Sequence, residues 1–403
     1  MPRIFYYNPT CEMAIANNHH SYQPPDRLKQ FEKDLGEILL FLANQEDAVI
    51  CHDHPDQEFL DFWKMLGKSM PQFVTPDQIT NHPQRGELVP TPWGGSKSVQ
   101  HFFKSLGLRL DLASKSLKDW EPAHQHFFSR RTSAVFEHAW LNGVIPEFCR
   151  LPSSPILAQT EEELMEFIEA SQHQAVIKSL WSSSGRGIFM VKQPEHATPA
   201  ITWAMGRIRR EGALVLETLM EKVADFSFQF HLSPNNTIHF LGINYFSTDE
   251  EGRFDKEWIH QPDIFDIIKK EKLLPGDWEK QCVAHLSPAL QSMQWHTQYE
   301  GIMGMDAMII KASDGSLRVR CCVEINFRHN MGLINMALKP FFGDKARGYW
   351  KIEQFEPGRW FEFYHEQRQK HPAVIENNRL VGGFFPLVSP DEGKQYAAWG
   401  IVE

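Results

Sequence analysis

The sequence predicts a mixed α/β fold that opens with a small, mostly parallel sheet and continues in antiparallel strands. Residues 1 to about 125 alternate short apolar runs with helical patterns, as βα units do. Residues 213–247 carry successive strand-like runs instead, with an Asn-Asn turn between two of them. A further strand pair follows at residues 304–326, around an Asp-Gly turn signal. These observations predict an α/β (α+β) protein with more than one domain.

The first domain is predicted as an open α/β sheet over residues 1–126. Ile4–Tyr7 and Ala48–Cys51 are apolar runs that end in polar turns, as strands of such a sheet do. The stretch Gln57–Leu66 follows the second run with helical periodicity, and Gly86–Val89 precedes another helical pattern. The alternation therefore predicts parallel strands joined by helices.

The second domain is predicted over residues 127–212. Thr132–Leu141 has a helical pattern that ends at Asn-Gly, and Thr160 with three following glutamates is a helix-capping sequence. Ala175–Lys178 and Ile188–Val191 are strand-like runs on either side of a Ser/Gly loop. A second helix is expected after them.

The third domain is predicted over residues 213–403. Its expected strands are Ala213–Glu217, Phe226–Leu232 and Thr237–Phe246. A long helix is expected over Trp278–Thr297, with a kink or a split at Pro288. Beyond residue 333 we expect one amphipathic helix, Arg359–Gln369, and an irregular tail.

The composition is that of an ordinary folded soluble protein. Hydrophobic residues make up 42% of the 403 residues, and the net charge of −10 argues against a general nucleic-acid binder. No stretch approaches the roughly 20 apolar residues of a membrane span, and the N-terminus lacks the apolar core of a signal peptide. Six cysteines without a Cys-x-x-Cys pair favour a reduced, cytoplasmic setting.

The predicted hairpin at residues 304–326 carries the most informative side chains, Asp306, Glu324 and Asn326. If residues 314–316 (Asp-Gly-Ser) form a three-residue loop, Asp306 lies opposite Glu324, and one face carries all three side chains. A two-residue Asp-Gly turn would place Asp306 and Glu324 on opposite faces. The three-residue loop gives the cleaner apolar face, so we expect that register. Arg328 continues the alternation on the polar side.

This arrangement predicts a cation site. Two carboxylates at cross-strand distance, ~5 Å between their Cβ atoms, repel each other unless a cation lies between them. Mg²⁺ binds one or two carboxylates and completes its shell with water and nucleotide phosphates. Asp306, Glu324 and Asn326 are therefore candidate Mg²⁺ ligands. Taken alone, the pattern also fits an ordinary solvated hairpin with scattered charge.

Lys178 and the loop that follows it predict a phosphate-binding element. Glycines let the backbone approach an anion closely, and Lys178 supplies a positive charge for phosphate oxygens. The lysine precedes the glycines and a strand follows them, so the segment is not a Walker A loop. The chain also lacks the His-Arg-Asp and Asp-Phe-Gly motifs of protein kinases. A flexible Ser-Gly hairpin loop is the plainer alternative.

The order of these motifs resembles the ATP-grasp superfamily of ATP-dependent ligases, over about residues 130–332. The resemblance implies an ATP-grasp fold behind an N-terminal, Rossmann-like pre-ATP-grasp domain. It implies that Glu217 and the backbone near Leu219 meet the adenine, and that Asp225 meets the ribose hydroxyls. The nucleotide contacts that it implies are Arg130, Lys178, Ser183, Ser184, Gly185, Arg186, Gly187, Glu217, Leu219 and Asp225.

The hairpin side chains match the family's metal site. Asp306, Glu324 and Asn326 correspond to its magnesium ligands, and Arg328 to the arginine of its Glu-x-Asn-x-Arg variant. Some relatives carry an arginine where this chain has Gly304, so Arg328 or Arg320 would have to supply that charge. The segment 249–276 has no clear counterpart and is a candidate for a substrate-specific insertion.

The resemblance implies ATP and Mg²⁺ as cofactors and a reaction between a small-molecule carboxylate and an amine, or less often a thiol, through an acylphosphate. Lys178 and Arg328 would be the catalytic residues. A phosphotransferase on the same fold and a nucleotide-binding protein without turnover are the alternatives. The sequence leaves open the two substrates and the oligomeric state, a homodimer included.

Several histidines are weaker candidates. His52 and His54 follow a predicted strand directly, and a strand-end loop is preferred there to a zinc site. His19 and His20 lie after the first strand, at the edge where open α/β sheets bind ligands. They are candidate substrate contacts.

Overall fold

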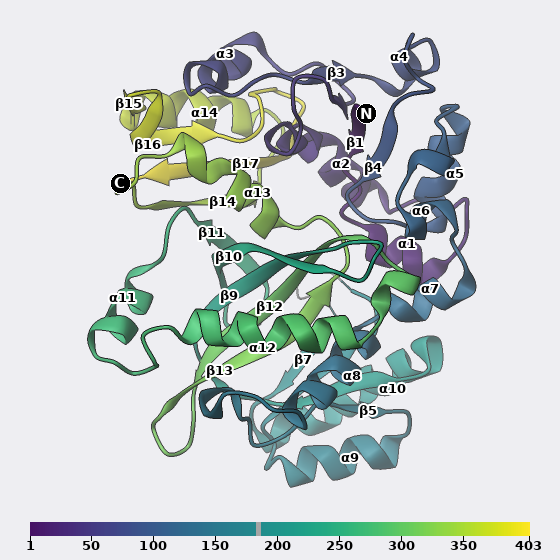
Figure 1. Cartoon of the computed structure of the whole chain (residues 1–403), viewed down its shortest axis with the longest axis vertical. Coiled ribbons are helices and arrows are strands. Elements are labelled where there is room, and N and C mark those ends of the chain that lie inside the picture. Colours follow the sequence, from purple (N-terminus) through teal and green to yellow (C-terminus); the bar gives the residue numbers. More distant parts are fainter. Residues whose placement is uncertain (183–186) are drawn as a thin grey trace. The chain divides into compact units, whose positions relative to one another are not determined.

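The computed structural model describes residues 1–182 and 187–403, which form two compact units (Figure 1). Unit 1 contains Met1–Trp120, Asp255–Pro262 and Arg328–Glu403, and unit 2 contains Glu121–Phe254 and Asp263–Phe327. The C-terminal segment thus belongs to the same compact unit as the N-terminal one. The three-part division at residues 126 and 212 stays a prediction about domains.

Unit 1 contains the parallel sheet that the sequence predicts, with strand order β3-β2-β1-β4. Its strands are β1 (Arg3–Tyr6), β2 (Ala48–Ile50), β3 (Gln72–Val74) and β4 (Val89–Pro92). One face packs Ile4 and Ile50 against Val99 and Phe103. The helices of this part are α1 (Cys11–Asn17), α2 (Asp26–Leu35), η1 (Gly36–Phe41), α3 (Gln57–Met65), α4 (Pro76–Thr80), α5 (Lys97–Ser105), η2 (Leu110–Leu112) and α6 (Lys115–Lys118).

The end of the chain forms antiparallel strands, so the expectation of an irregular tail is wrong. The strand order is β11-β14-β17-β16-β15. The elements are β11 (Phe254–Trp258), α13 (Met331–Leu338), η6 (Lys339–Phe341), β14 (Gly348–Gln354), α14 (Arg359–Lys370), β15 (Val374–Glu376), β16 (Arg379–Pro386) and β17 (Tyr396–Val402). β16 contains two glycines and β17 contains two alanines. Both residue types are uncommon in β-strands, so the sequence gives little sign of these two strands.

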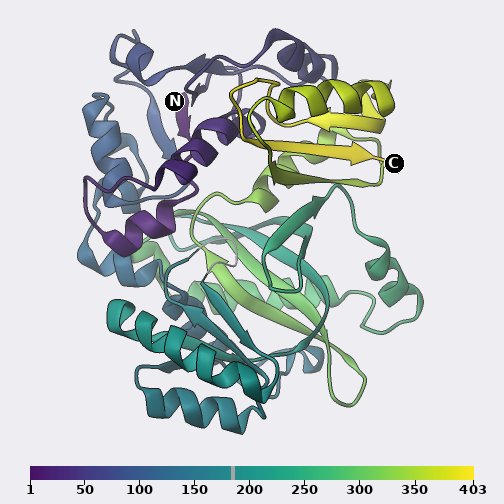
Figure 2. The ribbon, with the colours of Figure 1, turned by 180° about the vertical axis from the view of Figure 1, so that it is seen from behind.

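The smaller sheet of unit 2 has strand order β5-β8-β6-β7, all pairs antiparallel. Its strands are β5 (Ile156–Ala158), β6 (Ala175–Ser179), β7 (Ile188–Val191) and β8 (Leu214–Thr218). The helices α9 (Glu161–Ala170) and α10 (Ala197–Glu211), with η4 (Pro194–His196) between β7 and α10, supply the other half of its apolar core. Figure 2 shows α9 and α10 side by side. Thr160 caps α9 in a reciprocal capping box with Glu163, as the sequence predicts.

The longer strands of unit 2 run in the order β13-β12-β9-β10, again antiparallel. They are β9 (Glu221–Leu232), β10 (Ile238–Thr248), β12 (Gly301–Lys311) and β13 (Leu317–Asn326). Helix α12 (Trp278–Ser292) lies across them in Figure 1 and is not split at Pro288. The remaining helices are α7 (Pro122–Phe127), α8 (Arg130–Leu141), η3 (Glu147–Cys149), α11 (Asp263–Lys270) and η5 (Trp295–Thr297). Among the described residues, no helix is long and apolar enough to cross a membrane.

The hairpin β12–β13 has the predicted register at its open end. Asp306 pairs with Glu324, and Gly304 pairs with Asn326. The loop is one residue earlier than predicted, because Ala312 N donates to Ser316 O at 2.8 Å and encloses residues 313–315. A bulge makes up the difference: one residue of β12 faces three of β13 between the pairs Asp306–Glu324 and Met308–Arg320. The loop keeps its odd length, so the polar face is preserved.

Candidate functional site

The three predicted metal ligands converge at the open end of this hairpin. Asp306 lies opposite Glu324, and the amide nitrogen of Asn326 donates to Asp306 Oδ2 at 3.1 Å. The Asn326 side chain can offer its oxygen to a cation while its nitrogen holds Asp306. Two carboxylates and an amide oxygen are hard ligands of the kind that Mg²⁺ binds. The residues present therefore fit this ion.

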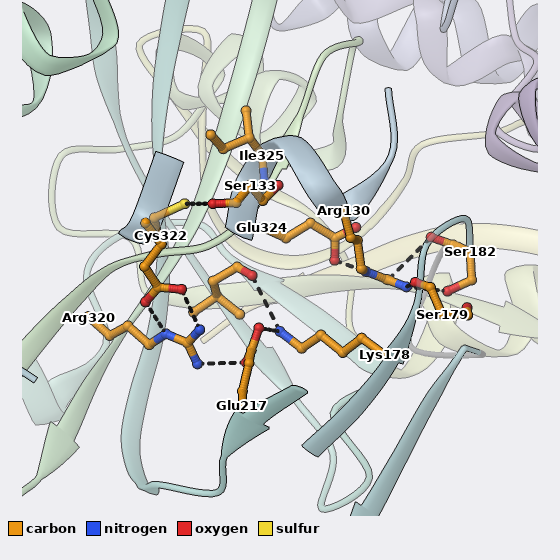
Figure 3. A network of polar contacts seen from close by, with 12 residues as sticks. Arg130, Ser133, Lys178, Ser179, Ser182, Glu217, Arg320, Cys322, Glu324 and Ile325 are labelled. Atoms are coloured by element: carbon orange, nitrogen blue, oxygen red, sulfur yellow. Dashed lines mark hydrogen bonds and ion pairs between the residues drawn. The ribbon is translucent and has the colours of Figure 1, made fainter. Parts of the chain in front are cut away.

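Arg130, the first residue of α8, connects the metal-ligand strand to the start of the Ser/Gly loop. Its Nη2 lies 3.1 Å from Glu324 Oε2, and its Nη1 donates to Ser182 Oγ at 2.7 Å and to Ser179 O at 2.9 Å (Figure 3). The guanidinium is buried, while the Glu324 side chain keeps 23% exposure. A fixed positive charge therefore lies beside a partly open carboxylate.

The base of the Ser/Gly loop is closed by tight contacts. Ser179 N donates to Gly187 O at 2.8 Å. A Cβ on Gly187 would lie 2.1 Å from Ser179 Oγ and 2.3 Å from Ser182 Oγ, so any other residue there would force the two serines to shift. The predicted contacts Ser183, Ser184, Gly185 and Arg186 lie outside the described residues.

Lys178 is the end of a buried chain of alternating charges (Figure 3). Its Nζ lies 2.7 Å from Glu217 Oε1 and 3.3 Å from Val323 O. The second oxygen of Glu217 accepts from Arg320 Nη1 at 2.8 Å. Arg320 in turn donates two hydrogen bonds of 2.7 Å to the carboxylate of Glu137, from Nε and from Nη2. Two cations and two anions thus cancel in the interior.

The electrostatics of Glu217 follow from this position. Burial disfavours its charged form, but Arg320 and Lys178 outweigh burial and lower the pKa of Glu217 to about 2. Glu217 is therefore an anion at neutral pH. Both of its oxygens serve cations of the protein, and its predicted contact with adenine stays a prediction.

The other predicted hinge residues have local partners. Leu219 N donates to Gln174 O at 2.8 Å. Asp225 accepts from Lys222 Nζ and from Thr248 Oγ1, each at 2.7 Å. Asp225 thus belongs to a polar group of its own, and the roles of Leu219 and Asp225 toward the nucleotide stay predictions.

Arg328 belongs to unit 1, directly after the boundary at Phe327. Its Nε forms an ion pair with Glu12 of α1. The next residue, His329, donates through Nδ1 to Pro92 O at 3.1 Å, and burial lowers the pKa of His329 to about 4. The predicted action of Arg328 on the transferring phosphoryl group stays a prediction.

The carboxyl ends of β1 and β4 form a second polar region, within unit 1. Asn8 Nδ2 donates to Gly94 O at 2.8 Å, which ties the loop after β1 to the loop after β4. Glu32 accepts from Thr10, and burial raises the pKa of Glu32 to about 7. This is the edge at which open α/β sheets bind ligands.

Some residues of these polar groups were not predicted from the sequence. Glu137 was not predicted, although it lies two turns after Arg130 on the same face of one helix. Glu12 and Glu32 gave no signal, because nothing in the sequence places them beside other polar groups. His19 and His20 are largely exposed in the loop after α1.

The chain has a distant relative among proteins of known function. No family model matches the chain. Over 292 residues it is 21% identical to the butirosin acyl-carrier protein–L-glutamate ligase of Niallia circulans. That alignment covers 72% of this chain and 63% of the relative, so the chain spans less than two thirds of the relative's length.

Solved structures share the fold. An ADP complex of PurK, the N5-carboxyaminoimidazole ribonucleotide synthetase, matches 100% of this chain and 92% of its own, with a TM-score of 0.50 and 10% identity. Biotin carboxylase from Campylobacter jejuni, solved with a β,γ-ATP ligand, matches 100% and 88%, with a TM-score of 0.50 and 9% identity. Both are ATP-grasp enzymes. At these identities the likeness concerns the fold alone.

Proposed function

We propose that this chain, which has the ATP-grasp fold, is an ATP- and Mg²⁺-dependent ligase that joins a carboxylate to an amine or a thiol. One observation carries the proposal: Asp306, Glu324 and Asn326 converge on one face, and Glu324 touches the buried Arg130. Arg130 also holds the start of the Ser/Gly loop through Ser182. The guanidinium of Arg130 thus contacts both the proposed cation site and the start of the proposed phosphate-binding loop.

The reaction would have two steps. A carboxylate oxygen of the first substrate attacks the γ-phosphorus of ATP, the bond from that phosphorus to the β,γ-bridging oxygen breaks, and ADP leaves. The nitrogen of the amine then attacks the acyl carbon of the acylphosphate, inorganic phosphate leaves, and the nitrogen loses a proton. Positioning and charge neutralisation account for most of the rate enhancement in such phosphoryl transfer.

The predicted site residues would divide this task. Asp306, Glu324 and Asn326 would hold Mg²⁺, which neutralises phosphate charge when bound. Lys178 and Arg130 would hold phosphate oxygens; their charges are already oriented by Glu217 and Glu324, so little reorganisation is needed. Arg328 would stabilise charge on the transferring group. The remaining ATP contacts are those that the sequence predicts.

The acceptor substrate would be a small molecule or a carrier. The Niallia circulans relative is named for an acyl-carrier protein and L-glutamate, which supports trying a carrier thiol beside free amines. The edge of unit 1 that contains the Asn8–Gly94 bonds and the Glu12–Arg328 pair is where we place acceptor binding. All six cysteines are buried and free, which supports the predicted cytoplasmic setting.

The test is a screen for ADP release with Mg²⁺ and ATP across amino acids, dipeptides, small carboxylic acids and carrier proteins. Hydroxylamine should trap the acylphosphate as a hydroxamate when the carboxylate is present. Free phosphate with an amide or thioester supports a ligase. ADP with a stable phosphorylated product would show a phosphotransferase instead.

The variant Glu324→Ala should abolish ADP release, because it removes a metal ligand and leaves the charge of Arg130 unbalanced. The control is Glu221→Ala, which removes an exposed carboxylate from β9 of the same unit and should leave turnover unchanged. Normal ADP release by a folded Glu324→Ala protein would refute the metal assignment.

A further inference from the structure

Three cysteines from distant parts of the sequence meet in the interior of unit 2. Cys149 ends η3, Cys282 lies in the first half of α12, and Cys321 lies in β13. Their exposures are 0%, 0% and 1%. Each pair of Sγ atoms is 3.7 Å apart, so the three sulfurs form an equilateral triangle.

The size of this triangle matches a metal site. With Zn–S bonds of about 2.3 Å and tetrahedral angles, neighbouring sulfurs are roughly 3.8 Å apart. The three sulfurs therefore already stand at three corners of such a tetrahedron, and an ion needs no rearrangement of the backbone to reach all of them. Thiolates are also the ligands that select Zn²⁺ and Cu(I) over hard cations such as Mg²⁺.

His285 is the candidate for the fourth corner. It lies one turn after Cys282 on α12, so the two side chains share a face of the helix. Its Nδ1 lies 3.0 Å from Val144 O. A carbonyl oxygen only accepts, so Nδ1 carries the hydrogen and Nε2 carries the lone pair. Metal-binding histidines commonly donate their second nitrogen to a backbone carbonyl in this way.

The position of His285 requires one adjustment. The group whose ligand atoms all lie within 4.8 Å of one another contains the three cysteines alone, among the described residues. The imidazole is partly exposed on the helix surface. The Nε2 of His285 therefore has to move toward the triangle before it can bind an ion there.

We propose that Cys149, Cys282 and Cys321 bind one soft d¹⁰ metal ion, Zn²⁺ in the first instance, with His285 as the fourth ligand. Four protein ligands make a closed site, which is structural rather than catalytic. The ion would tie η3, α12 and β13 together. Glu324 lies three residues after Cys321 on β13, so the ion would also stabilise the strand that carries two of the three proposed Mg²⁺ ligands.

The experiment uses the full chain, purified under reducing conditions, stripped with a chelator and titrated with Zn²⁺ or Co²⁺. We expect one equivalent of bound metal, a higher thermal midpoint with Zn²⁺, and with Co²⁺ the intense visible bands of a tetrahedral thiolate site. Cys321→Ser and Cys282→Ser should lose all three signals. His285→Gln should weaken binding by at least roughly 10- to 100-fold, the loss that follows when only the outer-shell partner of a metal ligand is changed.

The matched control is Cys322→Ser, the neighbouring residue on the same strand. Cys322 is equally buried, at 1% exposure, but its Sγ faces Ser133 O at 3.9 Å and not the triangle. This variant should bind metal as the wild type does. The thermal shift on adding Zn²⁺ is measured on the wild-type chain. The proposal can therefore be tested even if a cysteine variant does not fold.

Three results would overturn the proposal. One is a stripped wild-type chain, with all six thiols titratable, that binds less than a tenth of an equivalent and shows no thermal shift. Another is equal loss of metal in Cys321→Ser and Cys322→Ser, which would mean general destabilisation. A disulfide between two of the three cysteines that persists after purification under reducing conditions would identify a redox pair instead. Unchanged binding by His285→Gln would overturn the assignment of the fourth ligand.

Discussion

Glu217 holds two cations in the interior of unit 2, and this single side chain decides whether the buried charges balance. Lys178 contacts one of its oxygens and Arg320 the other, at 2.7 and 2.8 Å. Removing one member of a buried ion pair is costly, because it leaves an uncompensated charge where water cannot reach. The same residue therefore matters both for stability and for the orientation of the lysine that we assign to ATP.

Glu217→Ala should lower the free energy of unfolding by about 3–5 kcal/mol, the range for breaking a buried pair. Urea denaturation followed by circular dichroism measures the change. Glu221→Ala is the control, since its carboxylate is exposed on β9, the next strand along the chain, and it should stay within about 0.5 kcal/mol of the wild type. Equal effects of the two substitutions would contradict the buried network.

The pH dependence of stability should also depend on Glu217. Its pKa is lowered from the ordinary 4.5 to about 2 in the folded chain, so the charged form stabilises the fold above pH 4.5. This contribution is lost as the pH falls from 4.5 toward 2. The difference in unfolding free energy between wild type and Glu217→Gln should accordingly shrink over that interval. A difference that stays constant from pH 6 to pH 2 would argue against the lowered pKa.

At this scale the sequence predicts the chemistry of individual residues but not their partners. Asp306, Glu324 and Asn326 are predictable, because strand alternation and a turn relate them within one hairpin. Glu217 is 39 positions from its partner Lys178 in β6 and 103 positions from its partner Arg320 in β13. Arg320 is in turn 183 positions from Glu137 in α8. No local pattern relates residues at that separation.

The hairpin β12–β13 shows what an element can specify by itself. Its polar face requires a loop with an odd number of residues. The apolar residues of the opposite face favour this register, because a slip of one residue would turn Asp306 and Glu324 toward the core. The structure reaches this register with the loop at residues 313–315 and a bulge beside Ala307. The polar face was predictable from the alternation of residue types. The bulge was not, because the two extra residues of β13 follow no recognisable sequence pattern.

The base of the Ser/Gly loop is the element most sensitive to a single methyl group. Gly187→Ala would place a Cβ against Ser179 and Ser182, which Arg130 holds. The added methyl group would displace these residues from the positions that we assign to phosphate binding, so we expect the KM for ATP to rise by roughly tenfold, which corresponds to about 1.4 kcal/mol of binding free energy.

Steady-state kinetics with varied ATP test this prediction. Gly276→Ala serves as the control, because nothing lies within 4 Å of the added Cβ there. An unchanged KM for ATP in Gly187→Ala would mean that the loop base does not take part in nucleotide binding.

Each compact unit is assembled from segments that are distant in the sequence. In unit 1, the core that contains Phe5, Leu39 and Trp63 also contains Leu380, Phe385 and Trp399. Trp63 Nε1 donates to Pro386 O at 3.0 Å, and Lys394 Nζ lies 2.7 Å from the buried Glu37. The parallel sheet at the start of the chain therefore depends on strands at its end.

Deletion of residues 372–403 should unfold unit 1. Each large side chain of β16 and β17 contributes about 1.5–3 kcal/mol by its burial, and several are lost at once from a domain whose stability is about 5–15 kcal/mol. Soluble yield and near-ultraviolet circular dichroism measure the outcome. Arg379→Ala, which removes only an exposed ion pair with Asp344, should change neither. A soluble truncated chain with native aromatic signals would show that the tail is dispensable.

The sequence by itself determined the fold class, the ATP-grasp resemblance and the polar face of the metal hairpin. Each of these depends on short-range patterns: alternation along a strand, helix caps, and the spacing of a lysine from glycines. Only the tertiary structure decided where the C-terminal strands belong, which carboxylates balance Lys178 and Arg320, and that three scattered cysteines meet at 3.7 Å. These features depend on contacts between residues far apart in the chain, and such contacts are set by packing of the whole core rather than by any local preference.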